Sequence, residues 1–201
     1  MKNNEKQYAA YWIDHLKMTS HPEGGYYQEE YRSKKQVSME GREAKRQIMT
    51  TIYYLLENDD FSAFHRIKSP ESWFFHKGAS LLIYSFEEGV LVCRELSDQE
   101  NGVLQITIEP GTWFAARLKE PSGFTLVSCA VAPGFEYEDF ELADRNSLIT
   151  EYPDYKKEII GLTQKRYELF GILFAALQQM EFKSYPDKNT TKRAYRSFII
   201  F

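Results

Sequence analysis

Short hydrophobic runs alternate with polar turns through the middle of the chain. These runs are rich in β-branched and aromatic residues, and turn signals such as Lys77-Gly78 and Pro110-Gly111 separate them. The pattern predicts eight β-strands, at Thr50–Leu56, Ser62–Lys68, Trp73–Lys77, Leu81–Phe86, Gly89–Leu96, Leu104–Ile108, Trp113–Arg117 and Phe124–Val131. Strands do not alternate with helices, so the spacing favours an antiparallel sandwich or barrel over a doubly wound sheet.

The N-terminal region carries a different pattern. Residues 5–17 place four apolar side chains on one helical stripe and predict a short amphipathic helix: Tyr8, Tyr11, Trp12 and Leu16. A strand is predicted at Tyr26–Arg32. The highly charged segment Ser33–Arg46 is predicted to be a mobile loop.

The C-terminal region is predicted to be helical. Asp144–Leu162 carries short helical pieces around Pro153, and Gln164–Met180 predicts a longer helix that is too apolar to stand in water alone. The apolar end Ser197–Phe201 suits an edge strand, a partner contact or a disordered tail. The predicted organisation is an N-terminal helix in residues 1–19, a barrel in residues 20–143 and a helical extension in residues 144–201, packed on the barrel or at an oligomer interface.

Composition narrows the classes of function. A net charge of −4 argues against a general nucleic-acid partner. No apolar run approaches the roughly 18 residues of a membrane span, and the N-terminus carries no signal-peptide pattern. Cys93 and Cys129 lie in apolar β-like runs and are interpreted as buried thiols in a reducing compartment. A cytoplasmic protein without membrane or nucleic-acid partners is expected.

Two segments carry a recognisable spacing. The first places Glu71 six residues after His65 and Gly78 seven residues after Glu71, and the second contains Pro110-Gly111 before a strand. Together they resemble the two motifs of the cupin superfamily. The cupin pattern has further histidines where this chain has Ile67 and Phe114. The resemblance therefore implies the barrel without two of the usual four metal ligands.

Three further segments resemble one small, largely uncharacterised cupin family, DUF985. They are the His-Pro-Glu-Gly-Gly signature at His21–Tyr27, the strand Ile52–Leu56 and the closing segment Val131–Ala143. The resemblance runs from about Leu16 to Leu162. It implies a mainly β fold, a jelly-roll barrel (double-stranded β-helix) with flanking helices, usually paired as a homodimer. It implies little chemistry, because activities in this family are mostly unassigned.

Strand periodicity places the candidate chemistry inside the barrel. Residues two apart on a strand share a face, so His65 and Ile67 point the same way, as do Glu71, Trp73 and Phe75. In cupins the first His and the Glu point inward, so His65 and Glu71 are predicted to meet. Such a pair suits a general base, because the carboxylate fixes the tautomer of the imidazole and raises its basicity. A pair kept only for structure is the alternative.

Aromatic residues complete the predicted ligand site. Trp73, Phe75 and Phe114 would line the barrel wall as a stacking platform, or would simply fill the core. The turn that contains Glu23 is expected to be structural, or to form a lid or rim from which Glu23 or Tyr27 reaches the ligand. Phe135–Leu142 alternates aromatic and acidic residues and is expected to be a solvated strand edge, or to bring Tyr137 or Asp139 to the pocket mouth. Tyr27 is the candidate acid.

Metal binding is not predicted, and no cofactor is expected. His65 and Glu71 supply two donors, whereas a stable transition-metal site normally needs three or four. Additional donors would have to come from Cys129, His21 or Glu23.

Three functions follow from these residues. The first is a cupin that binds a small polar or aromatic metabolite and acts as a metal-free isomerase or epimerase, with His65 as base, Glu71 orienting it and Tyr27 or Tyr137 as acid. The second is a non-catalytic binding or sensing module. The third is a metal-dependent oxygenase or hydrolase with unconventional ligands. Fold alone does not choose among them.

Overall fold

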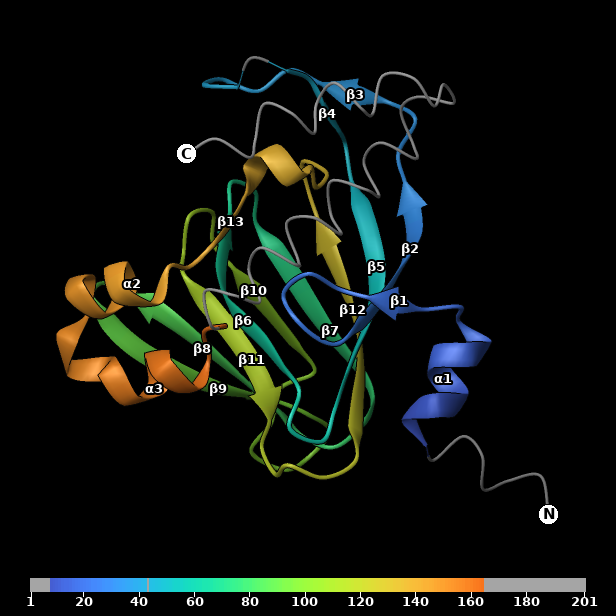
Figure 1. Cartoon of the computed structure of the whole chain (residues 1–201). Coiled ribbons are helices and arrows are strands. Elements are labelled where there is room, and N and C mark those ends of the chain that lie inside the picture. Colours follow the sequence, from blue (N-terminus) through green and yellow to red (C-terminus); the bar gives the residue numbers. More distant parts are fainter. Residues whose placement is uncertain (1–7, 43, 165–201) are drawn as a thin grey trace, which may run out of the picture. The chain divides into compact units, whose positions relative to one another are not determined.

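Two antiparallel sheets form the body of the computed structural model, which describes residues 8–42 and 44–164 (Figure 1). The first sheet has the strand order β1 (Thr19–Ser20), β2 (Tyr26–Arg32), β5 (Thr50–Glu57), β12 (Phe124–Val131), β7 (Glu71–Gly78) and β10 (Gln105–Ile108). The second has the order β13 (Phe140–Leu142), β6 (Phe61–Ile67), β11 (Phe114–Leu118), β8 (Leu81–Glu87) and β9 (Val90–Leu96). All eight strands predicted between Thr50 and Val131 are present, and the predicted mainly β fold is confirmed.

The main core lies between the two sheets. Inward side chains of both sheets meet there, as strand alternation requires: Tyr54, Leu56, Trp73, Leu81, Ile83, Leu96, Ile106, Ile108, Phe114, Ala116, Leu118, Val127 and Cys129. This core surrounds the residues that carry the candidate chemistry.

Helices cover the outer face of the second sheet. α2 (Arg145–Glu151) and α3 (Lys156–Gly161), joined by the 3-10 turn Pro153–Tyr155, bury Leu148 and Ile159 against Phe64 and Phe86. Strand β6 is therefore buried on both faces, which explains its nearly continuous apolar sequence. The helical pieces predicted around Pro153 agree with this arrangement.

The N-terminal helix is shorter than predicted. α1 (Ala9–His15) packs Trp12, Ile13 and Ala9 near the outward residues Leu55 and Leu126 of the first sheet. No helix in the described part of the chain has the length and apolarity needed to cross a bilayer. The helix predicted over Gln164–Met180 lies outside the described residues, apart from Gln164, as does the apolar end 197–201. The homodimer inferred from the family resemblance and these segments stays a prediction.

Two loop predictions were wrong in part. Within Ser33–Arg46, strands β3 (Gln36–Val37) and β4 (Arg46–Gln47) pair. The buried side chain of Arg46 binds the carboxylate of Asp139 through Nε and Nη2, at 2.6 and 3.1 Å. Asp139 ends the 3-10 turn η2 (Tyr137–Asp139) and is buried, contrary to the solvated edge expected for this segment. Ion pairing made burial of these charges possible. The following strand β13 does lie at the edge of the second sheet, with Glu141 exposed, as expected.

The turn His21–Gly25 joins β1 to β2 and is anchored to the second sheet. The Ala63 N–H donates to the Glu23 carbonyl at 2.9 Å, and the Tyr54 hydroxyl donates to the Gly24 carbonyl at 2.7 Å. Gly24 has a φ of +120°, and a Cβ there would lie 2.0 Å from the Phe61 carbonyl oxygen. Only glycine fits this close approach.

We expect Gly24→Ala to destabilise the protein by more than about 3 kcal/mol, because the strained φ and the backbone clash add. Gly89→Ala is the matched control, since Gly89 also has a positive φ, +83°, but a Cβ added there would meet nothing within 4 Å. Its cost should be about 1–2 kcal/mol. Urea unfolding followed by circular dichroism measures both, and equal costs would contradict the anchored turn.

Candidate functional site

The turn places the carboxylate of Glu23 against the imidazole of His65 inside the sandwich. Glu23 Oε2 lies 3.2 Å from His65 Nε2, and Glu23 and His65 are only 5% and 2% exposed. The Ser62 hydroxyl donates to Glu23 Oε1 at 3.0 Å. Both Ser62 and His65 belong to β6, so the strand and the anchored turn together fix the geometry of the pair.

The backbone determines the tautomer of His65. His65 Nδ1 lies 2.7 Å from the Ala63 carbonyl oxygen, which can only accept a hydrogen bond, so Nδ1 carries a proton. In the neutral imidazole Nε2 then carries a lone pair, which faces Glu23 Oε2. Two lone pairs at that distance repel, so one proton lies between Glu23 and His65.

Burial affects both members of the pair. It lowers the pKa of His65 to about 4, partly offset by the hydrogen bond to the Ala63 carbonyl. It raises the pKa of Glu23, offset in part by His21 and by hydrogen bonds from Ser62 and Tyr54. Both shifts favour the uncharged arrangement, in which the carboxylic acid donates to the imidazole.

Glu71 is not the hydrogen-bond partner predicted for His65. Within the described residues the side chain of His65 contacts Glu23 and the Ala63 carbonyl instead. Glu71 is buried, and burial, followed by the charge of Glu23, raises its pKa to about 8; Cys129 and Trp73 partly offset the rise. The described residues contain no direct hydrogen bond between His65 and Glu71, because the turn delivers a different carboxylate to the imidazole. The alternative expectation, a water molecule shared by His65 and Glu71, stays a prediction.

Aromatic rings enclose the imidazole. The centroid of Phe114 lies 4.1 Å from that of His65, and that of Phe140 lies 5.4 Å away. Trp73 meets Phe114 edge-on at 6.0 Å, whereas Phe75 is only partly buried against the same core. Trp73 and Phe114 are almost fully buried, at 1% and 0% exposure, so their role as a ligand platform stays a prediction.

The two candidate tyrosines lie near the same cluster. Tyr27 packs edge-on against His21, with centroids 4.7 Å apart, and His21 Nδ1 lies 3.7 Å from Glu23 Oε1. Burial and the neighbouring hydroxyl of Tyr27 raise the pKa of Tyr137, and Glu23 contributes to the same shift. The Tyr137 phenol therefore stays protonated at neutral pH.

The donors present do not fit the metal site of the cupin pattern. Ile67 and Phe114 are buried at two of the ligand positions and cannot coordinate. In residues 8–42 and 44–164 no group of three His, Cys, Asp or Glu side chains is arranged to hold a metal ion.

Sequence reasoning underestimated the turn. It placed Glu23 at the rim and did not identify Ser62 or Phe140 as neighbours of the pair. A signal was available, because His21-Pro22-Glu23-Gly24-Gly25 combines two titratable residues with two glycines that permit close backbone approach. The contact between this turn and β6 joins segments about 40 residues apart, and no local sequence pattern indicates it.

Comparison with known proteins identifies the family of the chain. A family model described as Cupin superfamily (DUF985) matches residues 10–143. A crystal structure of a Shewanella oneidensis protein is 34% identical, with a TM-score of 0.72, and the match covers 80% of this chain and 99% of that one. A hypothetical protein from Leishmania major is 31% identical, with a TM-score of 0.73 and coverage of 79% and 99%. No curated protein matches the chain.

The pKa shifts of Glu71 and His65 predict how stability depends on pH. Glu71 keeps its proton in the folded state up to about pH 8 but loses it near pH 4.5 in the unfolded state. Its contribution to the free energy of unfolding therefore falls as the pH rises from 4.5 to 8. His65 has the opposite effect on the free energy of unfolding. Between about pH 4 and 6.5 its imidazole binds a proton only in the unfolded state, so stability rises with pH there. Below pH 6.5 the two effects oppose each other, and from 6.5 to 8 stability should fall by about 2 kcal/mol.

Glu71→Gln should remove most of that slope, because the amide has a similar shape and does not ionise. Exposed Glu100→Gln is the control and should keep the wild-type slope. Unfolding free energies measured in urea at several pH values test this. A wild-type stability that is constant or rises toward pH 8 would refute the raised pKa of Glu71.

Proposed function

We propose that this chain, which belongs to the DUF985 family of the cupin superfamily, binds a small polar or aromatic metabolite in its barrel and moves a proton on it without a metal. The reaction class is isomerisation or epimerisation at a carbon beside a carbonyl. One observation carries the proposal: the carboxyl group of Glu23 and the imidazole of His65 are buried and held 3.2 Å apart.

The pair acts as a unit in this chemistry. It removes the proton from the carbon, and the electron pair of the C–H bond forms the C=C bond of an enol. After the transfer the pair holds two protons, one on the carboxyl group of Glu23 and one on Nε2 of His65. Nδ1 cannot take the new proton, because its hydrogen bond to the Ala63 carbonyl already keeps it protonated. Tyr137 or Tyr27 donates a proton to the carbonyl oxygen, and the pair then returns its proton to the neighbouring position, which isomerises the substrate. Epimerisation instead requires one of the tyrosines to protonate the original carbon from the face opposite the pair.

Energetics support a functional role for the pair. Burying a carboxyl group and an imidazole costs several kcal/mol unless their hydrogen bonds are satisfied, and apolar residues would fill the same space more cheaply. Here Ser62, Ala63 and an anchored turn hold two titratable groups in one fixed arrangement. Such preorganisation is what proton transfer to a bound substrate requires.

Deuterium exchange tests the proposal. Carbonyl-containing hydroxy acids and sugars are screened by thermal shift, and those that bind are followed in D₂O by proton NMR for loss of the signal beside the carbonyl. We expect exchange with the wild type and a rate at least about 100-fold lower in His65→Gln and Glu23→Gln. His76→Gln is the matched control, because His76 is exposed and bonded to Ser128 outside this cluster.

Two outcomes would contradict isomerase chemistry. Equal exchange in wild type and His65→Gln would remove the pair from the reaction. Binding without any exchange would instead support the non-catalytic binding or sensing function.

A further inference from the structure

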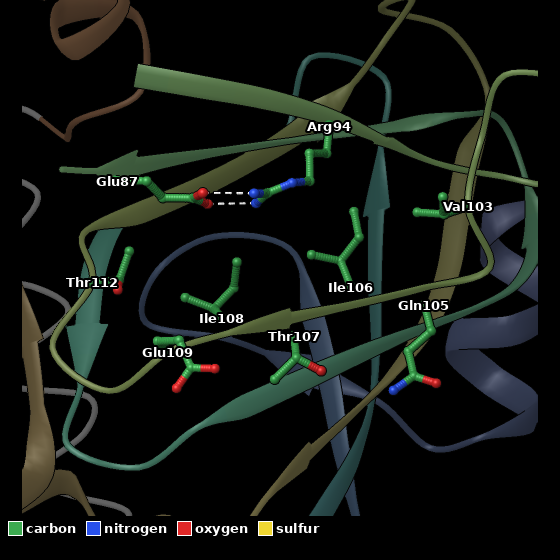
Figure 2. A pocket seen from close by; sticks show the side chains of 9 residues that line it. All are labelled: Glu87, Arg94, Val103, Gln105, Ile106, Thr107, Ile108, Glu109 and Thr112. Atoms are coloured by element: carbon green, nitrogen blue, oxygen red, sulfur yellow. Dashed lines mark hydrogen bonds and ion pairs between the residues drawn. The ribbon is translucent and has the colours of Figure 1, made fainter. Parts of the chain in front are cut away.

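A pocket opens between the edge strands of the two sheets. It has a volume of about 440 Å³, in the range that holds small molecules. Strand β9 ends one sheet and β10 ends the other within the described residues, and the pocket lies where they approach (Figure 2). Its lining includes none of the residues of the Glu23–His65 site: Glu87, Arg94, Val103, Gln105, Ile106, Thr107, Ile108, Glu109 and Thr112.

The pocket has two unlike walls. Glu87 and Arg94 come from β8 and β9, and Figure 2 shows them opposite Ile106 and Ile108 of β10. The isoleucines belong to the main core and are 5% and 3% exposed. One wall is therefore apolar and the other is formed by an ion pair.

The ion pair is bidentate and electrically balanced, and its Arg94 and Glu87 side chains are 40% and 37% exposed. Arg94 donates from both terminal nitrogens to the two oxygens of Glu87, at 2.5 and 2.6 Å. The Ser85 hydroxyl donates to the same carboxylate at 2.7 Å. A guanidinium locked in this way presents a flat face, and its charge is already neutralised.

We propose that this pocket binds a flat, uncharged heteroaromatic ring, stacked between the guanidinium of Arg94 and the side chains of Ile106 and Ile108. Arginine stacks on aromatic faces, and the partly exposed side chain of Arg94 leaves such a face open to the pocket. The isoleucines contact the other face of the ring. Gln105 and Thr112, which also line the pocket, provide hydrogen-bonding groups for ring substituents.

Other ligand classes fit the walls less well. A carboxylate would have to displace Glu87 from Arg94, and an amine would have to displace Arg94 from Glu87. A sugar offers no π face to the guanidinium. The balanced pair and the apolar wall therefore favour a neutral aromatic ring.

This site is separate from the proposed reaction site but shares a sheet with it. Ile106 and Ile108 are the register partners of Trp73 and Glu71 on β7. The ring would thus lie beside the barrel centre without contact to the Glu23–His65 pair. Its occupancy does not depend on the proposed function.

Binding of 2-aminopurine, a fluorescent neutral heteroaromatic, tests the proposal by fluorescence titration. We expect saturable binding to the full chain that weakens about tenfold or more in Arg94→Gln. Arg94→Lys, which keeps the charge but lacks the flat face, should weaken binding similarly. Arg117→Gln is the matched control, because Arg117 is exposed and bonds Tyr84 outside this pocket. It should bind like the wild type.

His65→Gln distinguishes the two sites and should bind 2-aminopurine normally. Loss of binding in His65→Gln would place the ring in the barrel centre and overturn the proposal. It is also overturned if Arg94→Gln and Arg94→Lys bind normally, if cyclohexanol displaces the probe equally well, or if millimolar 2-aminopurine does not bind. Circular dichroism of each variant confirms the fold before titration.

Discussion

One buried proton between Glu23 and His65 is the constraint around which the candidate site is built. The Ala63 carbonyl holds the other imidazole nitrogen protonated, so the carboxyl group and Nε2 must share a proton to avoid repulsion. Because Glu23 and His65 are only 5% and 2% exposed, either member alone would be an unsatisfied buried group, which is costly. The fold must therefore deliver both members together.

The fold meets this demand through two backbone arrangements. Strand β6, packed on both faces, fixes Ser62, Ala63 and His65 in sequence along one rigid element. The backbone of the turn His21–Gly25 accepts hydrogen bonds from Ala63 of β6 and from Tyr54. These bonds fix the position at which the Glu23 side chain enters the interior. Gly24 allows this because its missing side chain makes room for the Phe61 carbonyl.

Much of the architecture could be predicted from the sequence, and the pairing of Glu23 with His65 could not. Alternation within β6 and β7 correctly assigned inward positions to His65 and Trp73, because strand periodicity is local. The partner of His65 was assigned to Glu71, six residues along the chain. Glu23, 42 residues away, reaches it instead, through strand order and turn docking. Burial of Arg46 with Asp139 was missed for a similar reason, since a charge pattern does not reveal a distant partner.

Nitrogen-15 NMR of the His65 imidazole tests the shared proton most directly. The account predicts a protonated Nδ1, and an Nε2 shift typical of an unprotonated or hydrogen-bonded nitrogen that does not change between pH 5 and about 8, since burial holds the pKa of His65 near 4. Glu23→Gln should perturb the Nε2 resonance, while His76→Gln should not. A bare Nδ1 with a protonated Nε2, or titration of His65 near its ordinary pKa of 6.5, would contradict it.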